Sequence, residues 1–251
     1  MKAIILAAGL GTRLGEFGNN IPKGMIILNG KTLIERQIEI FNNCGIKDII
    51  IVTGHNGHLI NYPNIRYVKN PNYDTTNMNE SFFCAKDDFD DSIIVSYSDI
   101  TYEQKIIEQI LKSEHDFSVG IRLDWEKSYE NRTKHPLSEA ENAVIENKKI
   151  LCIKKNISNC LDSQQIGEFL GIMKFSRKGI SKFLENYINV KNNHEGKFHS
   201  SQSLKKAYLT DMLQEMIDSG TILHPVISNA MWIEIDTTED LKRAEELIKS
   251  N

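Results

Sequence analysis

Glycines and basic residues lie directly beyond an apolar run at the start of the chain. Gly9 and Gly11 follow the run at residues 3–8, and Arg13 and Lys23 come after them. A buried parallel strand has such a continuous apolar sequence, and ligands of open α/β sheets lie beyond the carboxyl ends of these strands. Glycines there let backbone N–H groups turn toward an anion, while arginine and lysine add charge for phosphate oxygens. The stretch therefore predicts a site for a triphosphate.

Two familiar nucleotide-binding motifs do not match this segment. The dinucleotide fingerprint GxGxxG needs a third glycine where Leu14 stands, and no Gly-Lys-Ser/Thr follows at the distance of a Walker motif. A tight strand-to-helix turn without a ligand is the alternative interpretation.

An aspartate follows a second apolar run. Residues 92–97 predict a buried central strand, and Asp99 comes just after it. A carboxylate at the end of a buried strand is poorly placed for packing and well placed to bind Mg²⁺. The alternative is that Asp99 only caps a helix predicted at 102–111.

A polar stretch from residue 124 to residue 141 shows no apolar periodicity. Such a long segment is typical of a surface loop, often a functional one. It contains Trp125 and Tyr129 among many charged residues. Aromatic faces beside carboxylates would suit a cationic head group.

The predicted strands and helices must position these residues, and they alternate along the chain. Apolar runs predict strands at 3–8, 48–53, 65–68 and 92–97, and a capping box at Thr32 and Glu35 predicts a helix that ends at Gly45. This order predicts a right-handed parallel crossover and an α/β fold. Further on we expect a strand at 25–28, a hairpin across Asn147-Lys148, a strand at 167–175, a helix at 178–187, a polar excursion at 189–203, a helix at 204–217, strands at 222–227 and 231–235, and a last helix opened by 236–240. Two close glycines, Gly167 and Gly171, indicate either backbone that approaches a ligand or a β-bulge.

The opening stretch resembles a known signature. Residues 7–14 with Pro22-Lys23 are similar to the nucleotidyltransferases that join an NTP to a phosphorylated acceptor and release pyrophosphate. The resemblance implies a Rossmann-like three-layer αβα sandwich with a mixed, mainly parallel sheet, as in nucleotide-diphospho-sugar transferases. It also implies a nucleotide-binding loop, two catalytic basic residues and two ligands of a magnesium ion. The loop comprises Leu6, Ala8, Gly9, Gly11 and Thr12, the basic residues are Arg13 and Lys23, and the ligands are Asp99 and Asp236, the latter in the similar closing motif at 232–236.

Other segments resemble one branch of this family. Residues 76–78 with Ser81 are similar to enzymes that use CTP, which implies that Asn77 and Ser81 approach the base; Asn77 as a helix N-cap is the alternative. The polar stretch resembles the acceptor-side insert of cytidylyltransferases acting on phosphocholine, phosphonates or phosphoamino acids. Its implied acceptor contacts are Trp125, Tyr129, Arg132, Glu141 and Lys154. For Arg132 a surface salt bridge is the alternative. Lys154 and Lys155 point to opposite faces of a strand, and which of them faces the site stays open.

Composition sets further limits. The chain has 251 residues, 40% hydrophobic and 25% charged, with a net charge of −4, which does not favour a nucleic-acid binder. Four widely spaced cysteines without a CxxC pair indicate neither a zinc site nor a disulfide framework. No stretch has the length of a signal or transmembrane segment. We expect a single domain over residues 1–251 with an insert at about 124–165, located in the cytoplasm as a monomer or homodimer.

These features predict a CTP-dependent cytidylyltransferase with Mg²⁺ as cofactor. Its substrates would be CTP and a small phosphorylated or phosphonate acceptor, with no nucleic-acid or membrane partner. One alternative is a sugar-1-phosphate nucleotidyltransferase that uses UTP or dTTP. Another is a non-catalytic nucleotide-sensing subunit with the same fold.

Overall fold

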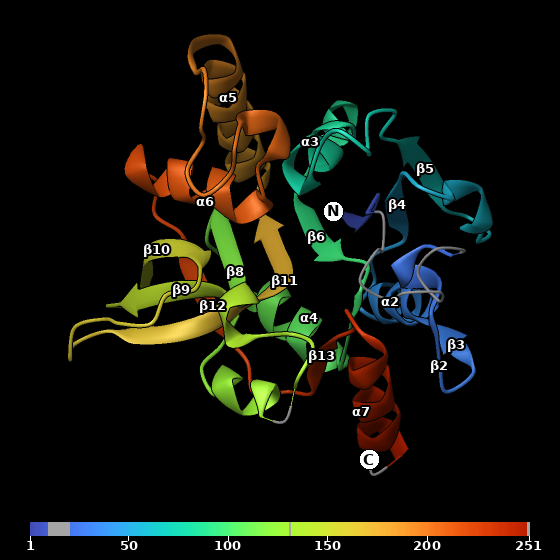
Figure 1. The fold of residues 1–251 in the computed structure, drawn as a ribbon. Coiled ribbons are helices and arrows are strands. Elements are labelled where there is room, and N and C mark those ends of the chain that lie inside the picture. The colour runs from blue at the N-terminus through green and yellow to red at the C-terminus, as the bar shows by residue number, and fades with distance from the viewer. Residues whose placement is uncertain (10–20, 131, 250–251) are drawn as a thin grey trace.

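Apolar, β-branched strands form the centre of the molecule (Figure 1). The computed structural model describes residues 1–9, 21–130 and 132–249. Within them, a mixed nine-stranded sheet has the order β10-β9-β11-β6-β1-β4-β5, with β8 paired to β11 and β12 paired to β8. Its strands are β1 (Lys2–Ala7), β4 (Asp48–Thr53), β5 (Arg66–Lys69), β6 (Ile93–Tyr97), β8 (Phe117–Arg122), β9 (Glu141–Glu146), β10 (Lys149–Lys155), β11 (Gln165–Phe175) and β12 (His224–Ile227).

The parallel part of the sheet places the end of β1 beside the end of β6. β1 pairs in parallel with β4 and β6, with Ile4 opposite both Ile50 and Val95. These strands are buried along almost their whole length, as expected for a sheet covered on both faces. The carboxyl ends of β1 and β6 therefore lie side by side, with Ala8 directly after the first and Asp99 shortly after the second.

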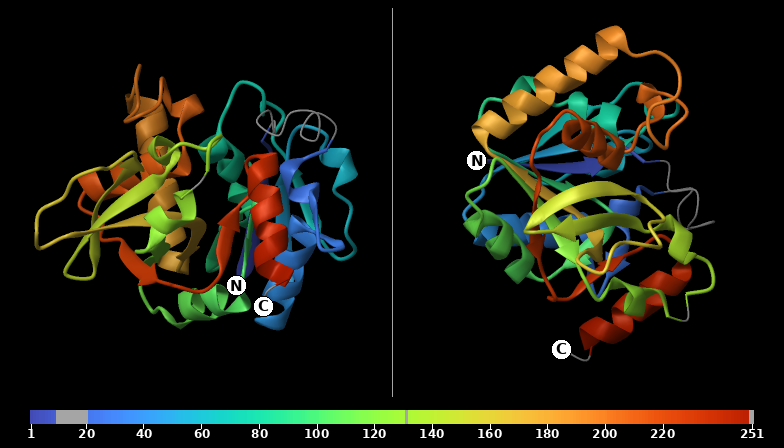
Figure 2. Two further views of the ribbon diagram at one scale, coloured as in Figure 1. Left: turned by 60° about the horizontal axis from the view of Figure 1, so that its bottom comes forward. Right: turned by 90° about the vertical axis from the view of Figure 1, so that its left-hand side faces the viewer.

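Helices cover both faces of the sheet (Figure 2). α3 (Met78–Phe83), α5 (Arg177–Asn193) and α6 (Leu209–Asp218) contact one another on one face. α2 (Leu33–Asn43) and α4 (Gln104–Lys112) lie on the other, while α7 (Thr238–Lys249) packs against β13 (Trp232–Glu234) and β2 (Ile27–Leu28). β13 pairs with β7 (Ile100–Tyr102) and β2 with β3 (Lys31–Thr32). This three-layer arrangement confirms the predicted fold class.

β11 connects the parallel strands to the antiparallel part. Its first residues pair with β9 and its last residues with β6 and β8. The register shifts between Phe169 and Met173, and Gly171 there has a φ of +69°. A Cβ at Gly171 would lie 2.8 Å from Tyr97 Cδ2, so glycine is required both by the backbone conformation and by space. Of the two explanations for the glycines, a bulge is present at Gly171.

Several local predictions match the structure. Thr32 and Glu35 form the expected capping box at the start of α2. The hairpin of β9 and β10 turns through Asn147 and Lys148, whose φ values of 51° and 60° are those of a type I′ turn.

Other boundaries differ from the prediction. α5 begins at a capping Ser176 and continues to Asn193, because Val190 is buried and holds its last turn, so part of the expected polar excursion is helical. Of the strand expected at 25–28, Ile27 and Leu28 form β2, while Met25 is the last residue of the 3₁₀ turn η2 (Lys23–Met25). The helix expected at 204–217 divides into η7 (Leu204–Lys206) and α6.

The remaining 3₁₀ turns are η3 (Gly57–Leu59), η4 (Lys86–Asp88), η5 (Trp125–Tyr129) and η6 (Leu137–Glu139). The cysteines are free thiols. Across the described part of the chain, no helix combines the length and apolar character needed to cross a membrane.

Candidate active site

Lys23 connects the two aspartates that the sequence singles out. Its Nζ donates to Asp99 Oδ2 at 3.1 Å and also to Asp236 Oδ1. The three residues come from η2, from the loop after β6 and from the loop after β13. Their side chains are 14%, 16% and 0% exposed. Asp99 and Asp236, far apart in sequence, thus meet at a single cation beyond the carboxyl end of β6.

The charge of Lys23 is stabilised by this position. Burial alone would lower the pKa of Lys23, but the carboxylates of Asp99 and Asp236 outweigh burial and raise it. The ammonium group is therefore permanently positive at neutral pH. Carboxylate oxygens that converge on one positive charge are also the ligands that hard divalent cations prefer, so the chemistry of the two aspartates fits a divalent metal ion.

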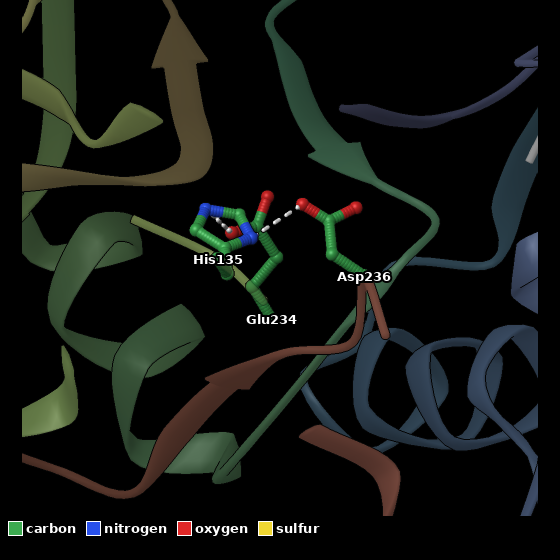
Figure 3. Close-up of side chains that lie close together, drawn as sticks. All are labelled: His135, Glu234 and Asp236. Carbon is green, nitrogen blue, oxygen red and sulfur yellow. Dashed lines mark ion pairs between the residues drawn. The ribbon is translucent and has the colours of Figure 1, made fainter. Parts of the chain in front are cut away.

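A histidine adds a second group of ligands around Asp236 (Figure 3). His135 Nδ1 lies 3.0 Å from Asp236 Oδ2, and His135 Nε2 lies 3.8 Å from Glu234 Oε2. Ligand atoms of the three residues all lie within 4.8 Å of one another. Burial, together with the nearby charges of Asp236 and Asp99, raises the pKa of Glu234.

Sequence reasoning missed His135 and Glu234. Glu234 stands two residues before Asp236 on an extended segment, and this spacing places both carboxylates on one face. His135 lies in an irregular polar loop and carries no such signal.

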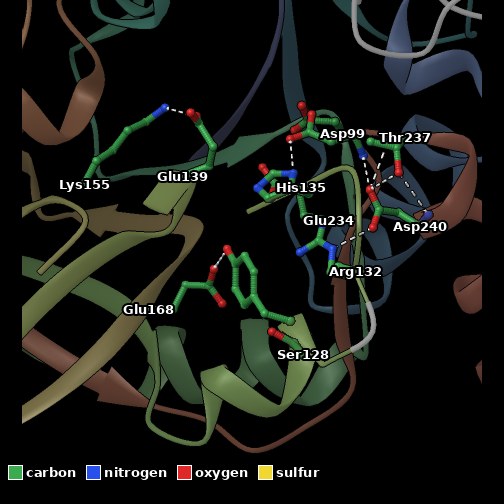
Figure 4. Close-up of polar contacts among 12 residues, drawn as sticks. Asp99, Ser128, Arg132, His135, Glu139, Lys155, Glu168, Glu234, Thr237 and Asp240 are labelled. Atoms are coloured by element: carbon green, nitrogen blue, oxygen red, sulfur yellow. Dashed lines mark hydrogen bonds and ion pairs between the residues drawn. The ribbon is translucent and has the colours of Figure 1, made fainter. Parts of the chain in front are cut away.

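Asp240 holds the loop of Asp236 in place (Figure 4). Its Oδ2 accepts from the backbone N–H of Asp236 at 3.2 Å and of Thr237 at 2.9 Å, and its own N–H donates to Thr237 Oγ1 at 3.3 Å. This is the reciprocal pattern of a capping box at the start of α7.

The other oxygen of Asp240 binds the insert. Arg132 Nε donates to Asp240 Oδ1 at 2.7 Å, and the two side chains are 4% and 1% exposed. The ion pair of Arg132 is therefore buried, whereas a surface salt bridge was the alternative interpretation. The polar stretch that contains Arg132 and the Asp236 loop are thereby joined through a single carboxylate.

A small acidic cavity of about 30 Å³ lies beside these residues, between the insert and the sheet. Tyr97, Tyr129 and Trp232 line it together with Glu141, Glu168 and Glu234. Glu141 accepts from Thr210 Oγ1 at 2.6 Å, and burial raises its pKa.

Glu168 is the most unusual group in this cavity. Its Oε1 accepts a hydrogen bond from Tyr129, while its buried Oε2 has no hydrogen-bond partner among the described residues. Burial raises the pKa of Glu168 to about 7, although the Tyr129 hydrogen bond and the charge of Arg132 oppose the shift.

A larger cavity of about 270 Å³ adjoins the acidic one. The two share Trp232 and Glu234 as lining residues. Its basic lining comes from the end of β8, from the insert and from α7, and comprises Arg122, Lys127, Arg132 and Arg243.

The loop predicted to bind the nucleotide is only partly within the described residues. Leu6 and Ala8 are buried at the end of β1, and Gly9 is exposed just beyond them. Gly11, Thr12 and Arg13 lie outside the described residues.

Asn77 and Ser81 occupy structural positions at the start of α3. Asn77 Oδ1 accepts from the Met78 N–H at 2.9 Å, which is the N-cap that the alternative interpretation gave it. Its side-chain amide donates to Lys206 O at 3.1 Å. Ser81 is buried and accepts from Asn70 Nδ2 at 3.0 Å.

The structure distributes the expected acceptor residues unevenly. Tyr129 and Glu141 line the acidic cavity and Arg132 the basic one. Trp125 is only 5% exposed, packs edge-on against Tyr129 and lines neither of these cavities. Its contact with the Tyr129 ring therefore stabilises the packing of this segment.

The two neighbouring lysines of β10 are now distinguished. Lys154 is exposed, whereas Lys155 Nζ lies 2.9 Å from Glu139 Oε2 and 4.4 Å from the centre of the Tyr208 ring. Lys155, rather than Lys154, is directed toward Glu139 at the acidic cavity, because alternation along the strand turns Lys154 to solvent.

The substitution Asp240→Ala is expected to lower the free energy of unfolding by about 3–5 kcal/mol, because it leaves Arg132 as an unpaired buried charge. Glu39→Ala is the matched control, since Glu39 pairs with Lys31 at 2.6 Å but both side chains are close to half exposed. Its cost should stay below about 1 kcal/mol. Urea unfolding measures both, and equal effects would contradict a special role for the buried pair.

The substitution Glu168→Gln is expected to flatten the pH dependence of stability. The folded pKa of Glu168, about 7, lies above the ordinary value of 4.5, so between these pH values the folded state binds more protons than the unfolded state. The free energy of unfolding therefore falls as pH rises through this window, by about 3 kcal/mol from this carboxyl. Urea unfolding at pH 5 and pH 8 tests the difference. Glu126→Gln, at an exposed position of the insert, should leave the slope as in the wild type. Parallel profiles for Glu168→Gln and the wild type would refute this expectation.

Comparison with known proteins places this site in a family. Residues 3–147 match the model of the MobA-like NTP transferase domain. The chain is 30% identical over 253 residues to the CTP:phosphoglutamine cytidylyltransferase of Campylobacter jejuni, covering 96% of this chain and 98% of that protein. It is 25% identical over 257 residues to the choline-phosphate cytidylyltransferase of Streptococcus pneumoniae, covering 100% and 99% of the two chains.

A solved structure shares the fold. The inositol-1-phosphate CTP transferase from T. maritima aligns with a TM-score of 0.75 at 20% identity, over 99% of this chain and 94% of that one. Because the family model covers more than half of the chain and a relative at 30% identity aligns over nearly its full length, the chain belongs to the NTP transferases with a MobA-like domain, the nucleotidyltransferase family that its sequence resembles.

Proposed function

We propose that this protein is a CTP-dependent cytidylyltransferase. It transfers CMP from CTP to a small phosphorylated or phosphonate acceptor and releases pyrophosphate. The observation that carries this proposal is the meeting of Lys23, Asp99 and Asp236 beyond the carboxyl ends of the central strands. Both relatives named above are cytidylyltransferases with non-sugar acceptors, which favours CTP and a small phospho-acceptor here.

The nucleotide half of the site is proposed to lie at the end of β1. Leu6 and Ala8 would support the loop from beneath, and Gly9, Gly11 and Thr12 would offer backbone N–H groups to the phosphates. Arg13 and Lys23 would supply positive charge to the same phosphates. Asn77 and Ser81 would influence base binding only indirectly. The N-cap hydrogen bond of Asn77 and the buried hydrogen bond of Ser81 fix the start of α3.

Enzymes of this family generally use a divalent metal ion. We propose Mg²⁺, held by Asp99 and Asp236, whose carboxylates already converge on one cation. When bound, it would supply positive charge that stabilises the leaving pyrophosphate.

The reaction needs no protein nucleophile. An oxygen of the acceptor phosphate is already anionic at neutral pH and attacks the α-phosphorus of CTP in line. The bond from the α-phosphorus to the oxygen that bridges it to the β-phosphorus breaks, and pyrophosphate leaves with that electron pair. The residues of this chain contribute position and charge, since the permanently charged Lys23 neutralises phosphate oxygens while its own aspartate contacts fix its direction.

The acceptor half is proposed to be the insert at about 124–165 of a single domain that spans the chain. Tyr129, Arg132 and Glu141 line its cavities, and Lys155 is the lysine directed toward them. Acidic lining favours an acceptor with a positively charged group over a neutral sugar.

A panel of nucleotides and acceptors tests the proposal. CTP, UTP, dTTP, ATP and GTP are each combined with phosphocholine, O-phosphoethanolamine, O-phosphoserine, 2-aminoethylphosphonate and glucose 1-phosphate, and pyrophosphate release is measured. We expect release with CTP and a small charged acceptor. Release only with glucose 1-phosphate and UTP or dTTP would assign a sugar nucleotidyltransferase instead. CTP binding without release from any combination would support a nucleotide-sensing protein.

The substitution Lys23→Ala is expected to lower kcat by a factor of about a hundred or more, because it removes a charge that acts on the phosphates during transfer. Lys31→Ala removes an exposed lysine of the same region and should leave kcat within about twofold. Steady-state rates, with circular dichroism to verify folding, measure both. A folded Lys23→Ala enzyme with near-normal kcat would be evidence against the assigned role.

A further inference from the structure

The acidic and basic cavities lie next to each other. Carboxylates line the acidic cavity, whereas the basic cavity has four basic side chains against the carboxylates of Glu234 and Asp240. The two cavities share Trp232 and Glu234, and Arg132 on the basic side lies 4.9 Å above the Tyr129 ring on the acidic side. A ligand that spans both would place a cationic group beside the carboxylates of the acidic cavity and an anionic group beside the basic side chains of the other cavity. The charges of both cavities together therefore restrict the chemistry of the acceptor more than the charges of one cavity do.

The acidic cavity selects a small cation. Glu141, Glu168 and Glu234 all face it, and Glu168 Oε2 is a buried acceptor that lacks a donor. Buried polar atoms are rarely left unpaired, so this oxygen marks a position for a donor that the protein does not provide. The volume of about 30 Å³ admits a group the size of one or two water molecules. A primary ammonium group fits this space, whereas a trimethylammonium group would require side chains to move.

The basic cavity is built for an anion. Arg132 Nη2 is a buried donor that has no hydrogen-bond partner in the described ranges. Lys127 and Arg243 also line the cavity, and neither takes part in an ion pair in the part of the chain that the structure describes. Arg122 is already paired with Asp124 at 2.8 Å. A carboxylate would satisfy the unpaired donors in the bidentate geometry that arginine favours.

We propose that the acceptor is a phosphorylated amino acid, whose ammonium group occupies the acidic cavity and whose carboxylate occupies the basic cavity. This proposal rests on the proposed cytidylyl transfer and names its substrate class. Phosphocholine carries no carboxylate and a cation too large for the acidic cavity, and sugar phosphates carry neither group. The phosphate is the third charged group of the acceptor and is the group that reacts with CTP.

A matched set of acceptors tests the two groups separately. O-Phosphoserine carries both, O-phosphoethanolamine only the ammonium group, 3-phosphooxypropanoate only the carboxylate, and ethyl phosphate neither. O-Phosphohomoserine and 3-aminopropyl phosphate repeat the comparison with one more methylene. With CTP saturating, we expect kcat/KM for the zwitterionic member to exceed that of either singly charged member by about tenfold or more at one of the two lengths.

Two substitutions should affect recognition of different groups of the acceptor. Arg243→Gln is expected to lower kcat/KM about tenfold for acceptors with a carboxylate and less than about twofold for O-phosphoethanolamine. Glu168→Gln should show the reverse preference, because it weakens only the ammonium subsite. Arg177→Gln is the matched control, since Arg177 is an exposed arginine at the start of α5. A general loss of structure would lower the rates for all acceptors together and is thereby recognised.

The possible results distinguish a failure of this proposal from a failure of the proposed function on which it rests. Pyrophosphate release from CTP with phosphocholine, phosphonates or sugar phosphates at rates above those of the zwitterionic acceptors would overturn the amino-acid assignment and leave cytidylyl transfer standing. Equal effects of Arg243→Gln on O-phosphoserine and O-phosphoethanolamine would also overturn it. No release from CTP with any acceptor of either panel would instead remove the proposed function.

Discussion

The fully buried carboxylate of Asp236 is the constraint on which the site depends. A charge withdrawn from water is costly unless it is paired and hydrogen-bonded. Here Lys23 and His135 contact its two oxygens, and the backbone N–H of the same residue is held by Asp240. Because these partners come from η2, from the insert and from α7, one carboxylate brings together segments from the whole length of the chain.

Asp240 extends this arrangement to the polar stretch that contains Arg132. One of its oxygens completes the start of α7, and the other binds Arg132. A capping residue ordinarily stabilises only its own helix. In this molecule it also holds Arg132, which lines the larger cavity, so the position of that side chain depends on the start of α7.

The sequence predicted the features that depend on local pattern. Continuous apolar runs indicated the parallel strands, the capping box at Thr32 and Glu35 is present, and the turn at Asn147 and Lys148 has the expected backbone. The convergence of Asp99 and Asp236 also followed, since each ends a strand of the resembling fold.

The remaining features of the site depend on tertiary contacts, which the sequence pattern does not show. His135 and Glu168 could not be identified, because an irregular loop and a strand buried on both faces give no sign of which side chain meets a cavity. Trp125 resembled an acceptor contact, yet its large apolar ring is more stable beneath Tyr129 than in contact with water. Lys155 rather than Lys154 is directed toward Glu139, since only the register of β10 determines which of two neighbours turns inward.

The bulge at Gly171 divides a single strand between two tasks. Residues before it pair with β9 and β8, and residues after it pair with β6 and β8. β11 thereby joins the hairpin of β9 and β10 to the parallel strands. Since a Cβ at Gly171 would collide with Tyr97, which lines the acidic cavity, the register of the sheet and the shape of that cavity depend on the same glycine.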